Sequence, residues 1–190
     1  MNVRIVEETV DSLQEYRTIP IAFRVASRFR VDAGQGLVEE AVAPYVKDYD
    51  ATSGEGPPSW RTRWDVSNWG VLAAYVGATP VPRRVGGAVI AWNTPGVNLL
   101  QGRDDLAVLW DLRVHPDYRR HGVGARLFEY AANWSRQRGC RHLMVETQNI
   151  NVAACRFYER QGCWLGEINP FAYADLPDEV QLLWYLDLTA

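Results

Sequence analysis

The stretch LAVLWDLRVHPDYRRHGVGARL, which occupies residues 106–127, carries the most information about the fold. Its apolar first half predicts a strand over Leu106–Val114, and the apolar periodicity that follows predicts an amphipathic helix over Val123–Arg138. A basic turn with Gly122 and Gly124 joins the two. Because a glycine-rich turn at the start of a helix directs several backbone N–H groups toward one point, it is typical of an anion site. The simplest such anion is a diphosphate.

Three kinds of glycine-rich phosphate loop can be compared with this turn. A nucleotide-binding P-loop requires Lys followed by Ser or Thr after its last glycine, whereas Ala125 and Arg126 stand there. A dinucleotide-binding loop requires a tighter turn and a third glycine where Leu127 stands, although Glu146 lies at the distance of its acidic residue. The third kind of loop has the pattern Arg-x-x-Gly-x-Gly, which begins here at Arg119, and the sequence favours it over the dinucleotide loop.

A second motif lies in the stretch HLMVETQNINVAACRFYERQGCWLG, residues 142–166. Its alternation predicts a strand over Leu143–Thr147, and Asn151 can cap a helix over Val152–Arg160. Gly162 stands where a glycine ends such a helix. In this order and spacing, the two motifs are far more specific together than either is alone.

The combined pattern resembles the GNAT N-acetyltransferases, whose phosphate loop is followed by a strand, an Asn, a Tyr-bearing helix and a Gly. The matching residues are Arg119, Gly122, Gly124, Asn151, Tyr158 and Gly162. Cys163 departs from the family, which usually has an aromatic residue there, and we interpret it as a packing substitution. The resemblance is firm over residues 70–168, with less similarity outside them.

This resemblance implies a fold and a cofactor. The expected fold is an α/β domain over residues 1–190, with a mixed, mostly antiparallel sheet of about six or seven strands, a splayed parallel pair and helices on both faces. Acetyl-CoA would place its pantetheine arm along Leu112 to Val114, with the Leu112 N–H directed at the thioester carbonyl. The implied cofactor residues are Leu112, Arg113, Val114, Arg119, Arg120, His121, Gly122, Val123, Gly124, Ala125, Asn151 and Tyr158.

Amine acetylation needs a group that removes a proton from the ammonium and another that protonates the departing thiolate. Tyr158 is the candidate acid, because an ordinary phenol stays protonated at neutral pH; the alternative is a core tyrosine. Asp111 and Glu146 are the candidates for the base. Strand alternation places Asp111 and Arg113 on one face and Trp110 on the other. Because a salt bridge to an arginine is the alternative for either carboxylate, the sequence leaves the base unassigned.

Composition sets broad limits on the function. A chain of 190 residues with 47% hydrophobic and 23% charged residues is typical of one globular domain. No apolar run reaches the ~20 residues of a membrane span, and the first residues lack a signal-peptide pattern. The net charge of -3 argues against a nucleic-acid binder. The 3 cysteines lack metal-site spacing, so we expect no metal and a reducing cytoplasm. A homodimer is left open.

Further elements are expected on either side of the two motifs. The expected strands are Val3–Val6 at a sheet edge, Trp69–Tyr75, Val85–Trp92 and Val180–Leu188. A helix is expected over Asp11–Ile19, and residues 29–50 fit a hairpin or a short helix. The expected loops are 48–63 and 93–105, with a hairpin turn over 78–84.

The acceptor is predicted from composition and from a narrower resemblance. Aromatic and acidic side chains suit a cationic amine, although most of the carboxylates fit a solvated surface equally well. The candidates are Trp60, Trp64, Trp69, Trp92, Glu39, Glu40, Asp48, Asp50 and Asp65. Four stretches resemble the streptothricin acetyltransferase branch of the GNAT family: FRV at Phe23–Val25, WDLRV, ETQNINVAAC and the tail from Ile168 to Leu188. This implies a primary amine of a small cationic molecule, such as an antibiotic. A protein or peptide N-acetyltransferase and a non-catalytic acyl-CoA-binding module are the alternatives.

Overall fold

The computed structural model describes residues 2–51, 56–77 and 82–189. The chain divides into two compact units whose segments alternate along the sequence. Unit 1 consists of Met1–Ile21, Tyr49–Leu143 and Asp187–Ala190, and unit 2 consists of Ala22–Asp48 and Met144–Leu186.

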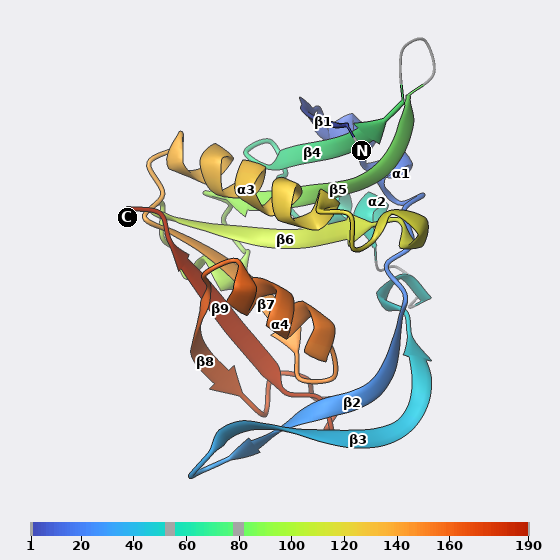
Figure 1. The fold of residues 1–190 in the computed structure, drawn as a ribbon. Coiled ribbons are helices and arrows are strands. Elements are labelled where there is room, and N and C mark those ends of the chain that lie inside the picture. Colours follow the sequence, from blue (N-terminus) through green and yellow to red (C-terminus); the bar gives the residue numbers. More distant parts are fainter. Residues whose placement is uncertain (1, 52–55, 78–81, 190) are drawn as a thin grey trace. The chain divides into compact units, whose positions relative to one another are not determined.

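Unit 1 contains a run of antiparallel strands with one long helix packed along it (Figure 1). The elements are β1 (Val3–Glu8), β4 (Gly70–Val76), β5 (Arg83–Trp92), β6 (Leu106–Val114) and α3 (Val123–Arg136). β1 pairs with β4, β4 with β5, and β5 with β6. The strand at β6 has the predicted bounds, and β1 lies at the sheet edge as expected. The predicted turn over 78–84 falls largely on residues 78–81, outside the described residues.

Helical segments cover both faces of β5, and two adjacent glycines make room for them. A Cβ on Gly86 would lie 3.2 Å from Leu127 of α3. A Cβ on Gly87 would instead lie 2.6 Å from the ring of Tyr16. Neighbouring residues of a strand point to opposite faces. The segment that carries Tyr16 therefore lies on the face of β5 opposite to α3, which confirms helices on both faces.

The remaining helices of unit 1 are short. They are η1 (Val10–Ser12), α1 (Leu13–Tyr16), η2 (Tyr49–Ala51), α2 (Pro57–Arg63), η3 (Asn98–Leu100) and η4 (Pro116–Tyr118), where η marks a 3-10 helix. The expected helix over Asp11–Ile19 is thus shorter than predicted. Thr18 and Ile19 donate their N–H groups to carbonyls only three residues back, a tight geometry that does not continue an α-helix.

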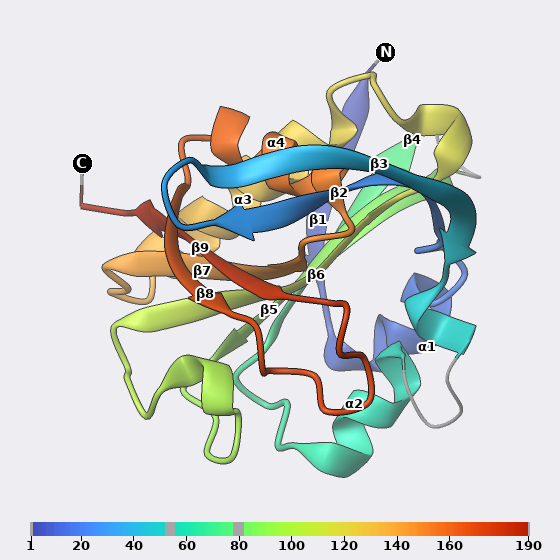
Figure 2. The same cartoon turned by 90° about the horizontal axis from the view of Figure 1, so that it is seen from below.

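The expected loop over 48–63 is wrong in its described second half. α2 begins at Pro57, a residue that favours the first position of a helix, and it buries Trp60 to 6% exposure. The sequence signal at Gly56, Pro57 and Pro58 is that of a helix start, which the polar composition of the segment concealed. Figure 2 shows α2 beside α1, with which it is in contact.

The structure resolves the alternative left open for residues 29–50 in favour of a hairpin, which lies in unit 2 and ends at Lys47. Tyr49 and Asp50 belong to the 3-10 helix η2 of unit 1. The elements of unit 2 are β2 (Phe23–Asp32), β3 (Gly36–Lys47), β7 (His142–Gln148, which begins in unit 1), α4 (Val152–Arg160), β8 (Trp164–Asn169) and β9 (Gln181–Asp187). β2 and β3 pair as an antiparallel sheet of their own. The predicted bounds of α4 are confirmed, and Gly162 ends the helix with a φ of 88°.

The strands other than β2 and β3 follow the hydrogen-bonded order β1-β4-β5-β6-β7-β9-β8 in a 7-stranded sheet. This mixed, mostly antiparallel arrangement with flanking helices confirms the predicted fold class. The splay of the parallel pair stays a prediction.

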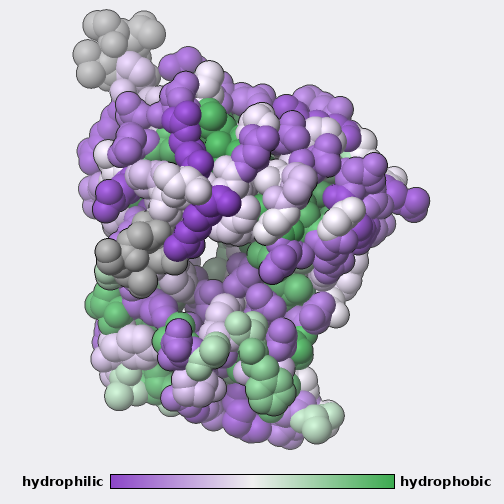
Figure 3. All heavy atoms as spheres, turned by 180° about the vertical axis from the view of Figure 1, so that it is seen from behind, coloured by the Kyte–Doolittle hydropathy of each residue, from purple (hydrophilic) through white to green (hydrophobic). Residues whose placement is uncertain are grey.

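The surface is mostly hydrophilic where Figure 3 draws it, with separate hydrophobic areas between the polar side chains. Large apolar side chains exposed in the described ranges include Tyr45, Val46, Trp164, Phe171 and Leu176, of which Phe171 is 90% exposed. No helix that the described residues form has the length and apolar character needed to cross a membrane.

Candidate active site

The glycine loop before α3 presents a row of unpaired backbone donors. Arg120 and Gly122 both have a left-handed backbone, with φ of 67° and 79°. The first bond of the helix is donated by the Arg126 N–H to the Gly122 carbonyl. No described residue accepts a hydrogen bond from the N–H groups of residues 120–125. Consecutive free N–H groups at the positive end of a 14-residue helix are the arrangement that favours an anion.

The side chains around this loop hold it in shape and leave space beside it. Arg119 donates from Nε to the Val114 carbonyl at 3.0 Å, which fixes the loop to the end of β6. The Nδ1 of His121 lies 2.8 Å from the Arg119 carbonyl. A Cβ on Gly122 would have no neighbour within 4 Å among the described residues, which therefore leave the space there open. These residues therefore fit a diphosphate held mainly by backbone donors.

The strand that leads into the loop contains a β-bulge at Trp110. Leu109 pairs with Ile90 and Asp111 with Val89, so no residue of β5 pairs with Trp110. A bulge interrupts the alternation of side chains along a strand. The prediction that Trp110 and Asp111 lie on opposite faces is therefore wrong.

The ring contacts of Trp110 show which face of β6 it shares with Asp111. Its ring lies 6.3 Å from Trp60, and the Trp60 ring lies 6.4 Å from Tyr16. Tyr16 in turn donates its hydroxyl to Asp111 at 2.9 Å. Trp110 and Asp111 therefore both border the α1 and α2 side of the strand.

Asp111 and Arg113 form a buried ion pair, which is the alternative that the sequence left open. The Arg113 guanidinium donates to Asp111 at 2.7 Å, and its side chain is 1% exposed against 6% for Asp111. It also donates to Asp50 at 2.5 Å and 3.0 Å and to the Ile19 carbonyl at 3.3 Å. The Arg113 side chain is thus fully engaged within unit 1. Any contact of Arg113 with a cofactor is left to its backbone.

The charges of this network depend on one another. Burial raises the pKa of the Asp111 carboxyl, against the opposing effect of the Arg113 charge. Burial also acts to lower the pKa of Arg113, but Asp111 and Asp50 outweigh it and raise that pKa above its ordinary value. The guanidinium therefore stays charged and holds η2 and α1 to β6.

We expect Arg113→Met to lower the free energy of unfolding by about 3–5 kcal/mol, because it leaves two nearly buried carboxylates without their cation. Urea unfolding of the variant and the wild type measures this loss. Arg141→Met, at an exposed position, is the control and should change stability by less than about 0.5 kcal/mol. A loss below about 1 kcal/mol for Arg113→Met would show that the network contributes little.

Unit 2 carries the second motif, in which Asn151 has a clear structural role. The Asn151 side chain accepts a hydrogen bond from the Ala154 N–H at 3.2 Å and so caps α4, as predicted. Tyr158 follows two turns later on the same helix. Its side chain is largely buried, with 7% of the residue exposed, and its ring lies 5.0 Å from that of Phe157.

Glu146, the other candidate base, has no arginine partner among the described residues. Its Oε1 accepts a hydrogen bond from the Tyr173 hydroxyl and lies 3.4 Å from the Gln148 amide nitrogen. Its Oε2 has no hydrogen-bond partner in the described part of the chain. The two candidate bases therefore differ, because Asp111 is held by a cation and Glu146 keeps one oxygen open.

Three of the four predicted tryptophans form an aromatic cluster in unit 1, and Trp110 joins them where Trp92 was expected. The Trp110 ring lies 4.9 Å from Trp64 and 5.2 Å from Trp69, and Trp60 completes the group. The fourth predicted tryptophan, Trp92, donates its indole N–H to the Asp104 carbonyl. The sequence missed Trp110 because only the bulge turns it toward the cluster.

Most of the carboxylates predicted to attract a cationic acceptor have partners in the structure. Glu39 pairs with Arg156, Glu40 with Arg28, and Asp50 with Arg113. Asp65 accepts a hydrogen bond from the Ser67 N–H. These pairings support the solvated or structural role that the sequence left as the alternative.

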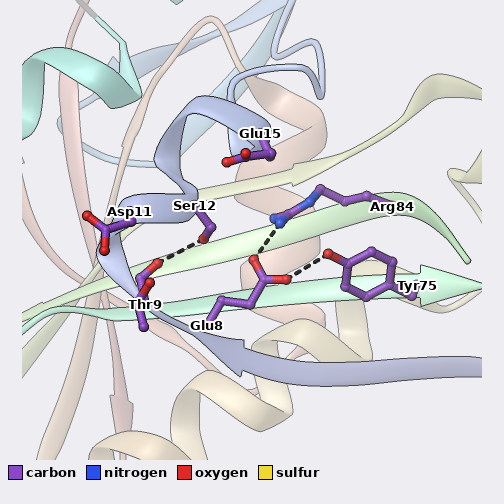
Figure 4. A pocket seen from close by; sticks show the side chains of 7 residues that line it. All are labelled: Glu8, Thr9, Asp11, Ser12, Glu15, Tyr75 and Arg84. Carbon is purple, nitrogen blue, oxygen red and sulfur yellow. Dashed lines mark hydrogen bonds and ion pairs between the residues drawn. The ribbon is translucent and has the colours of Figure 1, made fainter.

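A polar depression elsewhere on unit 1 contains none of the predicted site residues (Figure 4). Its lining residues are Glu8, Thr9, Asp11, Ser12, Glu15, Tyr75 and Arg84. Glu8 accepts hydrogen bonds from Tyr75, at 2.6 Å, and from Arg84. Burial acts to raise the pKa of Glu8, but hydrogen bonds from Tyr75, Arg84 and Ser12 and the charge of Arg84 outweigh it and hold the pKa below its ordinary value. The cluster ties β1 to β4 and β5.

Within the described ranges, no group of three or more His, Cys, Asp or Glu side chains could hold a metal ion. The 3 cysteines Cys140, Cys155 and Cys163 are buried and free, and burial raises their thiol pKa values to about 11, about 11 and about 12. They are therefore core residues rather than nucleophiles.

The model of the acetyltransferase (GNAT) family matches residues 29–163, which include both the glycine loop and the Asn151 motif. The chain belongs to this family. The predicted family and enzyme class, an acetyltransferase, are confirmed.

Several relatives of the chain share one name. The streptothricin acetyltransferase of Escherichia coli is 28% identical over 189 residues, which are 97% of this chain and 95% of that protein. Streptothricin acetyltransferase A of Bacillus subtilis (strain 168) is 36% identical over 81 residues, which are 42% of this chain and 47% of that protein. The chain thus spans less than half of the Bacillus subtilis relative.

The chain is also similar to solved structures of such acetyltransferases. A putative streptothricin acetyltransferase from Bacillus anthracis str. Ames, in complex with acetyl coenzyme A, is 28% identical, with a TM-score of 0.76 over 98% of this chain and 99% of that one. A nourseothricin acetyltransferase is 23% identical, with a TM-score of 0.75 over 99% of each chain, and shows the same fold.

Proposed function

We propose that this acetyltransferase moves an acetyl group from acetyl-CoA to a primary amine of a small cationic antibiotic of the streptothricin class. The observation that carries the proposal is the row of free N–H groups over residues 120–125, which fits the diphosphate of acetyl-CoA. The full-length similarity to the Escherichia coli streptothricin acetyltransferase supports the acceptor, and the Bacillus anthracis complex supports the donor. The single-domain prediction also stays a proposal, supported by a family match that runs through both units.

The donor would be held by backbone groups of two segments. The loop from Arg119 to Ala125 would bind the diphosphate, and the strand from Leu112 to Val114 would pair with the pantetheine arm. When bound, acetyl-CoA supplies the thioester that the amine attacks. The Leu112 N–H would then stabilise the oxyanion by about 3 kcal/mol.

The proton transfers are assigned to two residues of unit 2. Glu146 accepts a proton from the acceptor ammonium, directly or through water, so the nitrogen lone pair can form the new N–C bond. Tyr158 donates its phenolic proton to the sulfur as the C–S bond breaks, and the nitrogen releases its second proton to water as the amide forms. The open Oε2 of Glu146 favours it over Asp111, whose carboxylate is held by Arg113. Solvent exchange then restores both residues.

A peptide N-acetyltransferase is the second candidate. Its supporting observation is a local match, 38% identical over 58 residues, to the [ribosomal protein bS18]-alanine N-acetyltransferase of Escherichia coli (strain K12). That match covers 30% of this chain and 39% of that protein. The smaller coverage makes the small-molecule acceptor the better supported of the two.

An acceptor panel tests the proposal. We expect release of the CoA thiol with streptothricin and little with polyamines, aminoglycosides or an N-terminal peptide. The kcat/KM should rise with pH as the amine or its base loses a proton. Glu146→Gln should lower kcat by about 10-fold or more at unchanged stability. Asp111→Asn should also lose activity, but through the stability of the Arg113 network. Turnover of a peptide with none for any small amine would overturn the small-molecule acceptor and leave the fold and family standing.

Two further predictions concern the cellular compartment and the oligomeric state. The buried, free cysteines support a reducing compartment, and we propose the cytoplasm. A homodimer also stays a proposal, which sedimentation of the purified protein would test.

A further inference from the structure

A hydroxyl from the loop between β8 and β9 reaches the two polar side chains on β7. Tyr173 donates its hydroxyl proton to Oε1 of Glu146. The Gln148 amide nitrogen lies 3.0 Å from the Tyr173 oxygen and 3.4 Å from the same Glu146 oxygen. All three residues belong to unit 2.

The direction of these hydrogen bonds follows from the chemistry of the groups. An ionised carboxylate accepts only, and an amide NH₂ donates only. The Tyr173 oxygen therefore accepts from Gln148, and its single proton goes to Glu146. Oε1 of Glu146 is fixed by two donors, while Oε2 has no partner among the residues described. Hydrogen bonds to an ionised acceptor are the stronger ones, so this arrangement holds the carboxylate in one orientation.

The loop that supplies Tyr173 is itself held at defined points. The Leu176 N–H bonds to the Tyr173 carbonyl at 3.1 Å, and the Glu179 N–H bonds to the Leu176 carbonyl at 2.9 Å. The Glu179 side chain is 10% exposed and pairs with Lys47 at 2.5 Å. The position of the Tyr173 hydroxyl is therefore set by a closed turn and an ion pair at its end.

We propose that Tyr173 is a positioning residue for the acetyl transfer, which holds Glu146 so that Oε2 faces the acceptor ammonium. This inference rests on the proposed function, because it assumes that Glu146 is the base. Tyr173 does not exchange a proton with the substrate. It acts on the reaction only through the carboxylate that it orients, with Gln148 fixing the direction of its hydroxyl.

A double-mutant cycle tests the proposal, with the acceptor that the panel identifies. We expect Tyr173→Phe to lower kcat by about 10-fold, the effect of losing one hydrogen bond to a charged group, with the KM for acetyl-CoA and the melting temperature unchanged. In a Glu146→Gln background, the same change should lower kcat by less than about twofold. Tyr185→Phe is the matched control, because it removes a hydroxyl from a ring of the same unit that stacks on Trp164. It should leave kcat unchanged.

The outcomes separate this inference from the function on which it rests. A normal kcat in Tyr173→Phe, with Glu146→Gln impaired, overturns the positioning role alone. Equal losses from Tyr173→Phe in both backgrounds also overturn it, because the hydroxyl would then act independently of Glu146. Absence of turnover for every amine by the wild type overturns the proposed function and this inference together.

Discussion

Replacing Tyr158 by phenylalanine is expected to lower kcat by about 10- to 1000-fold while acetyl-CoA binds almost as before. The change removes the one proton that this side chain can give to the departing thiolate and keeps the ring that packs beside Phe157. Stopped-flow measurement of CoA thiol release at saturating acceptor would give kcat, and calorimetry would give the affinity for acetyl-CoA.

The control for this variant is Tyr130→Phe on α3. Tyr130 is 42% exposed and lies outside the predicted site, so its loss of a hydroxyl should leave kcat unchanged. The catalytic assignment fails if Tyr158→Phe keeps a near-normal kcat under conditions where the chemical step limits the rate. Tyr158 would then be a core residue of α4, as its low exposure alone would suggest.

The parts of the site that the sequence predicted best are those with local causes. A left-handed backbone at Gly122 and a side-chain cap at Asn151 each depend on a few neighbouring residues. The glycine loop, α3 and α4 therefore follow from short stretches of sequence. The same holds for the end of α4 at Gly162.

The parts that the sequence missed depend on residues far apart in the chain. Asp50 and Arg113 are separated by 63 positions, and no sequence periodicity predicts that their side chains form an ion pair. Tyr173 and Glu146 are separated by 27 positions and meet through a loop. The bulge at Trp110 is likewise a property of the pairing between β5 and β6, which alternation within one strand does not reveal.

The unassigned base illustrates the same limit. From the sequence, Asp111 and Glu146 are equivalent carboxylates on neighbouring predicted strands. The structure distinguishes them by their partners, a buried arginine for Asp111 and a tyrosine for Glu146. A guanidinium occupies the oxygens of the carboxylate that it pairs with, so the partner decides which group is open to a substrate proton.

Substituting valine for Gly124 should weaken CoA binding by about 100-fold while the protein stays folded. Gly124 occupies the second position of α3, directly after Val123, where its N–H belongs to the free donors of the loop. A branched side chain there would keep the diphosphate from approaching the amides, and losing two hydrogen bonds to a charged group costs about 3 kcal/mol or more. The fold should tolerate the change, because Gly124 does not have a positive φ and valine forms helix more readily than glycine.

Calorimetry with CoA, together with a thermal melt of each variant, separates loss of binding from loss of fold. Glu129→Val supplies the control, since it places the same side chain at an exposed position of the same helix and should bind CoA normally. A folded Gly124→Val protein with unchanged CoA affinity would remove the glycine loop from the cofactor site. Preferential binding of NADH by the wild type would contradict the assignment of acetyl-CoA itself, because the free amides of residues 120–125 would then bind a dinucleotide.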